Sequence, residues 1–64
     1  MFSIEDHGTI VLIRPLTPDA KAWLLEHVDP EAQWFGDALA AEPRYAEVIA
    51  ETFVEDGFDW LRAR

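Results

Sequence analysis

The sequence predicts a small α+β domain in which two helices pack on a sheet of about four, mostly antiparallel, strands. Two amphipathic segments, at residues 17–29 and 43–56, carry apolar residues at helical spacing. Short segments with alternating or β-branched apolar residues precede, separate and follow them. The predicted order is ββαβαβ. A length of 64 residues leaves room for one domain, so we expect a single compact acidic unit over residues 1–64.

The first two strands are predicted to form a hairpin. Phe2 and Ile4 alternate with polar neighbours, and residues 6–8 supply a turn in which Gly8 can take a positive φ. Residues 9–13 are β-branched and apolar on both faces. This pattern suits a central strand that is covered on each side or paired with a partner.

The first helix is predicted to begin at Thr17, whose side chain can cap it, with Pro18 at the first helical position. Pro30 is expected to stop this helix, because a proline disfavours helical geometry in the residue before it. Residues 33–41 are interpreted as one strand, in which Gly36 marks a bulge or a close backbone approach.

The second helix is expected to run from Pro43 to about Asp56, with Gly57 as its left-handed cap and a short strand at residues 58–61 after it. Its buried stripe is predicted to contain Tyr45, Val48, Ile49, Thr52 and Phe53. The predicted core of the domain consists of Ile10, Leu12, Trp23, Leu24, Val28, Val48, Ile49 and Phe53. Leu25, Leu61 and one tryptophan lack an obvious core position, which predicts a modest exposed apolar patch.

Composition and charge exclude several classes of protein. Thirteen acidic and five basic residues give a formal net charge of -8 at pH 7, which repels nucleic acids and anionic lipids, so we predict no direct nucleic-acid binding. Half of the residues are hydrophobic, which indicates a folded domain rather than a disordered acidic tail. The chain has no cysteine, and its longest apolar run is residues 10–13. We therefore predict no membrane association and a cytoplasmic location.

The sequence contains no recognisable catalytic combination of side chains. His7 lies in the predicted turn, and we interpret it as a turn residue rather than a general base. His27, Asp29 and Glu31 have a spacing that could suit a metal, but Pro30 interrupts regular geometry there. We therefore predict no enzyme activity, no metal ligands and no cofactor.

The most informative pattern is a row of glutamates on the second predicted helix. Glu47, Glu51 and Glu55 repeat every four residues, about 6 Å apart along the axis. Like charges at this spacing cost about 0.2–0.5 kcal/mol per pair. Asp56 and Asp59 extend the negative surface past the helix end, where the helix dipole disfavours anions. These five residues form the predicted partner-binding site. The alternative is an ordinary solvated helix face.

Three parts of the chain resemble a family of short proteins from proteobacteria and their phages. They are residues 5–11 (EDHGTIV), residues 31–36 (EAQWFG) with residues 42–45 (EPRY), and residues 55–58 (EDGF). A small, acidic, cysteine-free domain is also similar in character to phage-encoded anti-CRISPR proteins, which commonly act on DNA-binding surfaces of CRISPR complexes, including those of type I. The resemblance supports the expected turns and helix starts, and it carries no functional residue over to this chain.

Charge and resemblance together predict an inhibitor that binds a basic nucleic-acid-binding surface of a protein complex. An anti-CRISPR protein that mimics DNA and blocks target binding by a type I surveillance complex, in the cytoplasm of a bacterial host cell, would fit this description. The alternative is a small interaction or structural protein, such as a homodimer formed through an apolar edge strand, whose acidity serves only solubility. A monomer and a homodimer are both compatible with the sequence.

Overall fold

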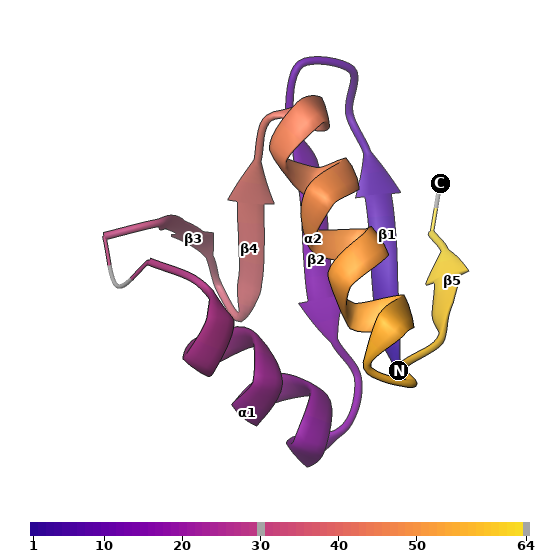
Figure 1. The fold of residues 1–64 in the computed structure, drawn as a ribbon. Helices are drawn as coiled ribbons and strands as arrows, with labels where there is room; N and C mark the ends of the chain where they lie inside the picture. The colour runs from indigo at the N-terminus through magenta and orange to yellow at the C-terminus, as the bar shows by residue number, and fades with distance from the viewer. Residues whose placement is uncertain (30, 64) are drawn as a thin grey trace.

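One sheet of five strands carries two helices on one of its faces (Figure 1). The structure, a computed structural model, describes residues 1–29 and 31–63. The elements in chain order are β1 (Phe2–Asp6), β2 (Val11–Pro15), α1 (Pro18–His27), β3 (Gln33–Phe35), β4 (Ala38–Ala41), α2 (Pro43–Glu55) and β5 (Trp60–Arg62). The predicted α+β class is confirmed, with five strands rather than about four.

The strands lie in the order β3-β4-β2-β1-β5, and all neighbours except the last pair are antiparallel. β5 joins the outer edge of β1 in parallel, with Trp60 opposite Phe2. β4 and β5 run in the same direction, and α2 makes the crossover that this arrangement requires. α2 is thereby held across the middle of the sheet.

The segment at residues 33–41 forms two strands, so the prediction of one strand there is wrong. Gly36 and Asp37 make a two-residue turn between β3 and β4, and Gly36 has a φ of 65°. Two-residue hairpin turns need positive φ, which glycine adopts without strain. The glycine that suggested a bulge therefore lies in a turn at which the chain reverses direction. Asp37 in this turn accepts a hydrogen bond from Arg14 Nε at 3.2 Å.

The predicted turns and helix ends are largely confirmed, but β2 begins and ends two residues later than the strand predicted at residues 9–13, and β5 lies at residues 60–62 rather than 58–61. Gly8 closes the first hairpin with a φ of 87°, and Thr17 Oγ1 caps α1 by accepting from the Ala20 N–H at 3.3 Å. α1 ends at His27, and the expected stop at Pro30 lies outside the described residues. α2 ends in a Schellman motif, in which the Phe58 N–H donates to the carbonyl of Phe53 across left-handed Gly57.

The core lies between the helices and one face of the sheet. Its centre is aromatic: the Phe2 ring stacks on Phe53 at a centroid distance of 4.2 Å, and Trp23 meets Phe53 edge-on at 6.1 Å. Such contacts add to the stabilisation that burial alone supplies. The buried cluster consists of Phe2, Val11, Ile13, Ala20, Trp23, Leu24, Val28, Leu39, Ala41, Ala46, Ile49 and Phe53.

Three predicted buried residues are exposed instead. Val48 is 53% exposed and Tyr45 is 38% exposed, because α2 rests on the sheet through a narrower stripe of Ala46, Ile49 and Phe53. Val48 precedes Ile49 by one residue, which turns it about 100° away from the contact. Ile10 is 39% exposed because it precedes β2 on the uncovered side of the sheet.

The second face of the sheet carries no helix formed by residues 1–29 or 31–63. Strand alternation brings nine side chains to this bare face, and none of them belongs to the helix-covered core cluster. They are Ser3, Glu5, Leu12, Arg14, Gln33, Phe35, Ala38, Ala40 and Leu61. Leu12 therefore is buried as predicted, but on the side opposite the other core residues.

Candidate acidic interface

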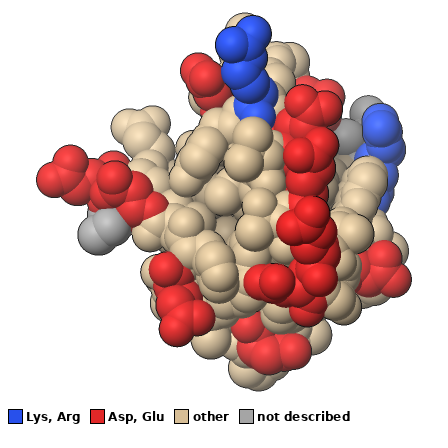
Figure 2. All heavy atoms as spheres, viewed as in Figure 1, with Lys and Arg blue, Asp and Glu red and all other residues tan. Residues whose placement is uncertain are grey.

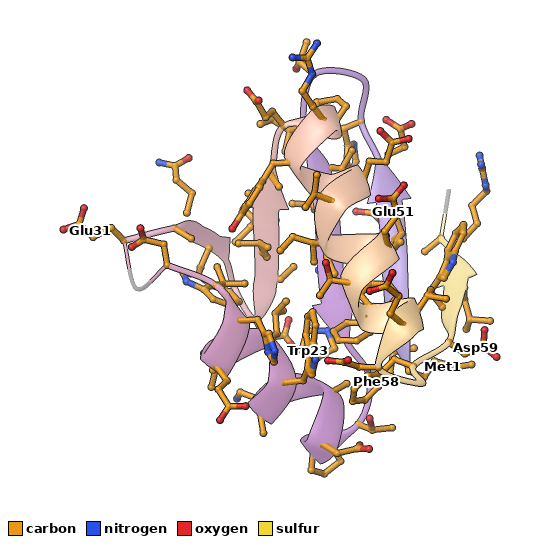
Figure 3. The ribbon with its side chains drawn as sticks, viewed as in Figure 1. Met1, Trp23, Glu31, Glu51, Phe58 and Asp59 are labelled. Carbon is orange, nitrogen blue, oxygen red and sulfur yellow. The ribbon has the colours of Figure 1, made fainter. Side chains whose placement is uncertain are left out.

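The predicted glutamates lie in one column along α2. The helix contacts the sheet through Ala46, Ile49 and Phe53, so residues at 47, 51 and 55 emerge together on another side. All three glutamates are exposed. Figure 2 shows an unbroken column of acidic side chains over α2. Figure 3 places Glu51 on the side of the helix that faces β1 and β5.

The acidic column, which we define as Glu47, Glu51 and Glu55, has no ion pair within the described part of the chain. The ionic contacts there join His7 to Glu5, Arg14 to Asp37 and His27 to Asp56. Two like-charged pairs at four-residue spacing destabilise the helix by roughly 0.4–1 kcal/mol in total. The column therefore works against the stability of the helix that carries it.

The dimensions of the column match a short stretch of a nucleic-acid strand in length but not in charge density. Its three charges span about 12 Å along the helix axis, since an α-helix rises about 1.5 Å per residue. A DNA strand carries one phosphate per about 3.4 Å of axis, so about four to five phosphates fit in the span that the three glutamates occupy. A basic groove would thus meet a ligand of lower charge density than its usual one.

Asp56 has a structural partner and does not belong to the column. The Trp23 indole Nε1 donates to Asp56 Oδ2 at 2.6 Å, and His27 Nε2 lies 4.0 Å from the same oxygen. The His27 ring stacks on Trp23 at a centroid distance of 4.1 Å, and its Nδ1 lies 2.8 Å from the Trp23 carbonyl oxygen. These contacts join the end of α2 to α1, a role that sequence reasoning missed.

Asp59 lies beyond the C-terminal end of α2, at the entrance to β5 (Figure 3). Its backbone carbonyl accepts a hydrogen bond from the Phe2 N–H at 2.9 Å, while its side chain is exposed. The carboxylate of Asp59 can therefore contribute to an acidic surface while the backbone of Asp59 stays hydrogen-bonded to β1. Of the five predicted site residues, the structure brings three into a column, places Asp59 past its end and turns Asp56 towards α1.

A groove of about 350 Å³ runs beside the column, between α2 and the strands β1 and β5. Glu47 and Asp6 contribute acidic groups to it, and Trp60 and Arg62 of β5 contribute an exposed ring and a cation. Sequence reasoning missed both β5 residues as part of the site. Their alternation with Leu61 was visible, but the parallel pairing of β5 with β1 that places them beside α2 was not.

Within residues 1–29 and 31–63, no three His, Asp or Glu side chains converge as metal ligands would. His27 is engaged with Trp23 and Asp56 rather than with Asp29, whose Oδ1 accepts from the Glu31 N–H at 2.8 Å. The spacing of these residues in the sequence is thus explained by a turn and a helix contact.

Two carboxyl groups, one half-buried and one exposed, have a lowered pKa. A hydrogen bond with His7 holds the pKa of Glu5 below its ordinary value, and the nearby charges of His7 and Arg14 act in the same direction. A hydrogen bond with Thr17 lowers the pKa of Asp19, assisted by the backbone N–H groups at the start of α1. Both groups therefore favour the ionised form, and neither belongs to the acidic column.

Comparisons with known proteins found no relative of this chain. No protein-family model matches it, and no curated protein and no solved structure matches it either. The resemblance described from the sequence motifs therefore stays a prediction. No helix in the described part of the chain is both long enough and apolar enough to cross a membrane.

Proposed function

We propose that this chain is a protein inhibitor that uses the acidic column on α2 to occupy a basic nucleic-acid-binding surface of another protein. The observation that carries the proposal is a row of three exposed carboxylates, held on a helix and without an ion pair among the described residues. A type I CRISPR surveillance complex is the partner we propose to test first, in the cytoplasm of a bacterial host cell.

The fold supports this mode of action because α2 is anchored along its length. Ile49 and Phe53 are buried in the core, and the Schellman motif and the Trp23–Asp56 hydrogen bond fix the C-terminal end. A carboxylate row on a fixed helix loses less conformational entropy on binding than the same charges on a flexible tail. The inhibitor would act by occupancy: target DNA and the column would compete for the same Lys and Arg side chains.

Long-range charge adds to the contact itself. A net charge of -8 attracts a basic surface from a distance and raises the association rate, and salt screens this attraction. Asp59 enlarges the acidic surface at one end of the column, whereas Arg62 in the adjacent groove limits it on the side of β5. We therefore expect binding to be led by the three glutamates.

The test replaces the column by uncharged amides of similar shape. The triple variant Glu47→Gln, Glu51→Gln, Glu55→Gln should bind a purified type I surveillance complex more weakly, with slower association, and should compete less with target DNA. Its affinity should also fall less steeply between 50 mM and 300 mM salt. Its thermal stability should be unchanged or higher, because the like-charge repulsion on α2 is removed.

A matched control replaces three other exposed glutamates, Glu26, Glu31 and Glu42, with glutamine. These three residues lie outside the column. This variant has the same net charge as the test variant, so it loses the same long-range attraction but keeps the local row. Equal loss of affinity in both variants would mean that net charge alone acts. Equal affinity of the parent and the column variant at both salt concentrations would remove the column from the mechanism.

A further inference from the structure

Five of the nine side chains on the bare face of the sheet are apolar. Phe35 is 66% exposed and Leu61 is 52% exposed, and both belong to this face with Leu12, Ala38 and Ala40. An antiparallel sheet with one side in water normally alternates apolar with polar residues. β2 instead has Leu12 on the bare face between Val11 and Ile13 on the covered face. A partner on this face would cover Phe35 and Leu61, which the described part of the chain leaves exposed.

A shallow hollow lies on the bare face beside Phe35. It measures about 330 Å³ and is lined mainly by apolar atoms of Ile10, Leu12, Phe35 and Ala40, with Glu5 and His7 at its border. A phenylalanine ring is small enough to enter a hollow of this volume. The same face thus offers both a protruding aromatic ring and an apolar depression that can receive one.

Charge separates the bare face from the rest of the molecule. Among its nine side chains, only Glu5 and Arg14 carry a full charge, and these sum to zero in a chain whose total is -8. Both are also engaged locally, Glu5 with His7 at 2.8 Å and Arg14 with Asp37 at 3.2 Å. A second acidic molecule is repelled least where it approaches this face.

We propose that the bare face binds a second copy of this chain, so that two sheets pack face to face about a two-fold axis. Such an interface is self-complementary: Phe35 of each copy would enter the hollow of the other. The match in charge supports this occupant, since a basic partner would be drawn to α2 and its acidic surroundings rather than to a neutral apolar surface. Both acidic columns would remain exposed, because α2 lies on the opposite face of the sheet.

The available area predicts a weak dimer. Five strands about 4.8 Å apart make a face of roughly 24 Å by 15 Å, with an accessible area of roughly 500 Å² once side-chain relief is included. This is about a tenth of the 4364 Å² surface of one copy, and two copies would bury roughly 1,000 Å². That total lies at the lower limit for specific interfaces, so we expect a dimer that dissociates on dilution.

Sedimentation velocity of the complete chain over a concentration range of about 5 µM to 1 mM tests the proposal. The parent should shift from monomer to dimer in this range, and Phe35→Asp should weaken the dimer at least about tenfold, because a carboxylate would be buried without a partner. Leu25→Asp is the matched control: Leu25 is 58% exposed on α1, so this change adds the same charge on the opposite side. It should leave dimerisation nearly unchanged.

Two further readouts keep the outcome decisive. Leu61→Asp, at the far end of the bare face, should also weaken the dimer, and it replaces Phe35→Asp if circular dichroism shows that variant to be unfolded. Raising the salt concentration should strengthen the dimer by screening repulsion between two acidic copies, opposite to the trend expected for a basic partner. A parent that stays monomeric at 1 mM, or a dimer that only Leu25→Asp weakens, would overturn the proposal.

Discussion

The two faces of the sheet use the same strands in different ways. On the covered face, Phe2, Ile13 and Leu39 are almost fully buried against α1 and α2. On the bare face, Leu12 and Ala38 are shielded from water without any helix above them in the described part of the chain, and Phe35 protrudes. The comparison shows that burial in so small a domain need not mark the main core. One face stabilises the monomer, and the other is available for contact.

Charge follows the same division. The side that carries the helices holds the acidic column and most of the other carboxylates, as Figure 2 shows for the face that it displays. The bare face is neutral. A protein with one strongly charged side and one neutral apolar side can bind a basic partner and a copy of itself without competition between the two contacts. Each of the following experiments tests one part of this division.

The largest effect is expected from truncating a phenylalanine on the covered face, and the same truncation on the bare face should have almost none. Phe53→Ala should cost about 3–5 kcal/mol, because it removes a fully buried ring that stacks on Phe2. Phe35→Ala, the same substitution on the bare face, should change the free energy of unfolding of the dilute monomer by no more than about 0.5 kcal/mol. Urea denaturation at about 2 µM protein measures both.

A domain of this size has a net stability of only about 3–5 kcal/mol, so Phe53→Ala should be largely unfolded at 25 °C. The milder Ile49→Val, in the same buried stripe, should cost about 0.5–1.5 kcal/mol and keeps a measurable transition. Similar losses for Phe53→Ala and Phe35→Ala would contradict the view that one face alone stabilises the monomer.

A smaller effect is expected where the acidic side contains a carboxylate with a structural role. Asp56→Ala removes the acceptor of the Trp23 indole N–H and should cost about 1 kcal/mol, since Asp56 is partly exposed and water can replace some of the hydrogen bond. Asp59→Ala is the control, because its side chain has no hydrogen-bond partner among the described residues. Thermal melts of the two variants should therefore differ. If both melt like the parent, the contact between α1 and α2 at this point is not stabilising.

Local features of the fold could be predicted from the sequence, because their causes lie within a few residues. Thr17 caps α1, Gly8 closes a turn and Gly57 ends α2, each as expected from side-chain chemistry or positive φ. The acidic column was predicted for the same reason: four-residue spacing on a helix fixes its geometry. The error at residues 33–41 arose because Gly36 is compatible with a bulge and with a turn. Only the pairing of β4 with β3 and with β2 shows that a turn forms there.

Features that depend on distant contacts could not be predicted. Asp56 meets Trp23 across 33 residues of sequence, and no local pattern indicates this hydrogen bond. Trp60 and Arg62 approach α2 only because β5 pairs with β1. Val48 was assigned to the core because the sequence does not show where the buried stripe of a helix ends. In the structure, the angle at which α2 meets the sheet sets the limit of that stripe. Residues 9–13 predicted either cover on each side of the strand or a partner; in the described part of the chain the helices cover only one face of β2, and the partner stays a prediction.

The smallest effect concerns acid, and it should appear equally on both faces. Asp19 at the start of α1 has a pKa lowered by a hydrogen bond with Thr17. Glu5 on the bare face has a pKa lowered by a hydrogen bond with His7. A folded pKa below the unfolded pKa means that each group contributes to stability above about pH 4, and that this contribution is lost as the pH falls through the folded pKa. Asp19→Asn and Glu5→Gln should therefore be slightly less stable than the parent at pH 6 and equal to it at pH 2.

Urea midpoints at pH 6, pH 4 and pH 2 measure this convergence, with Glu26→Gln as the control. Glu26 lies near the C-terminal end of α1, where the helix dipole disfavours a carboxylate, so its replacement should leave stability at pH 6 unchanged or raise it. If acid destabilised only the side that carries the helices, the urea midpoint of Asp19→Asn would converge with that of the parent at pH 2. The midpoint of Glu5→Gln, on the bare face, would not. A gap between parent and variant that persists at pH 2 would show that the lost hydrogen bond acts on the backbone and not through the carboxylate charge. Because Glu5 lies on the proposed dimer interface, the midpoints are compared at about 2 µM protein, a concentration at which we expect the chain to be monomeric.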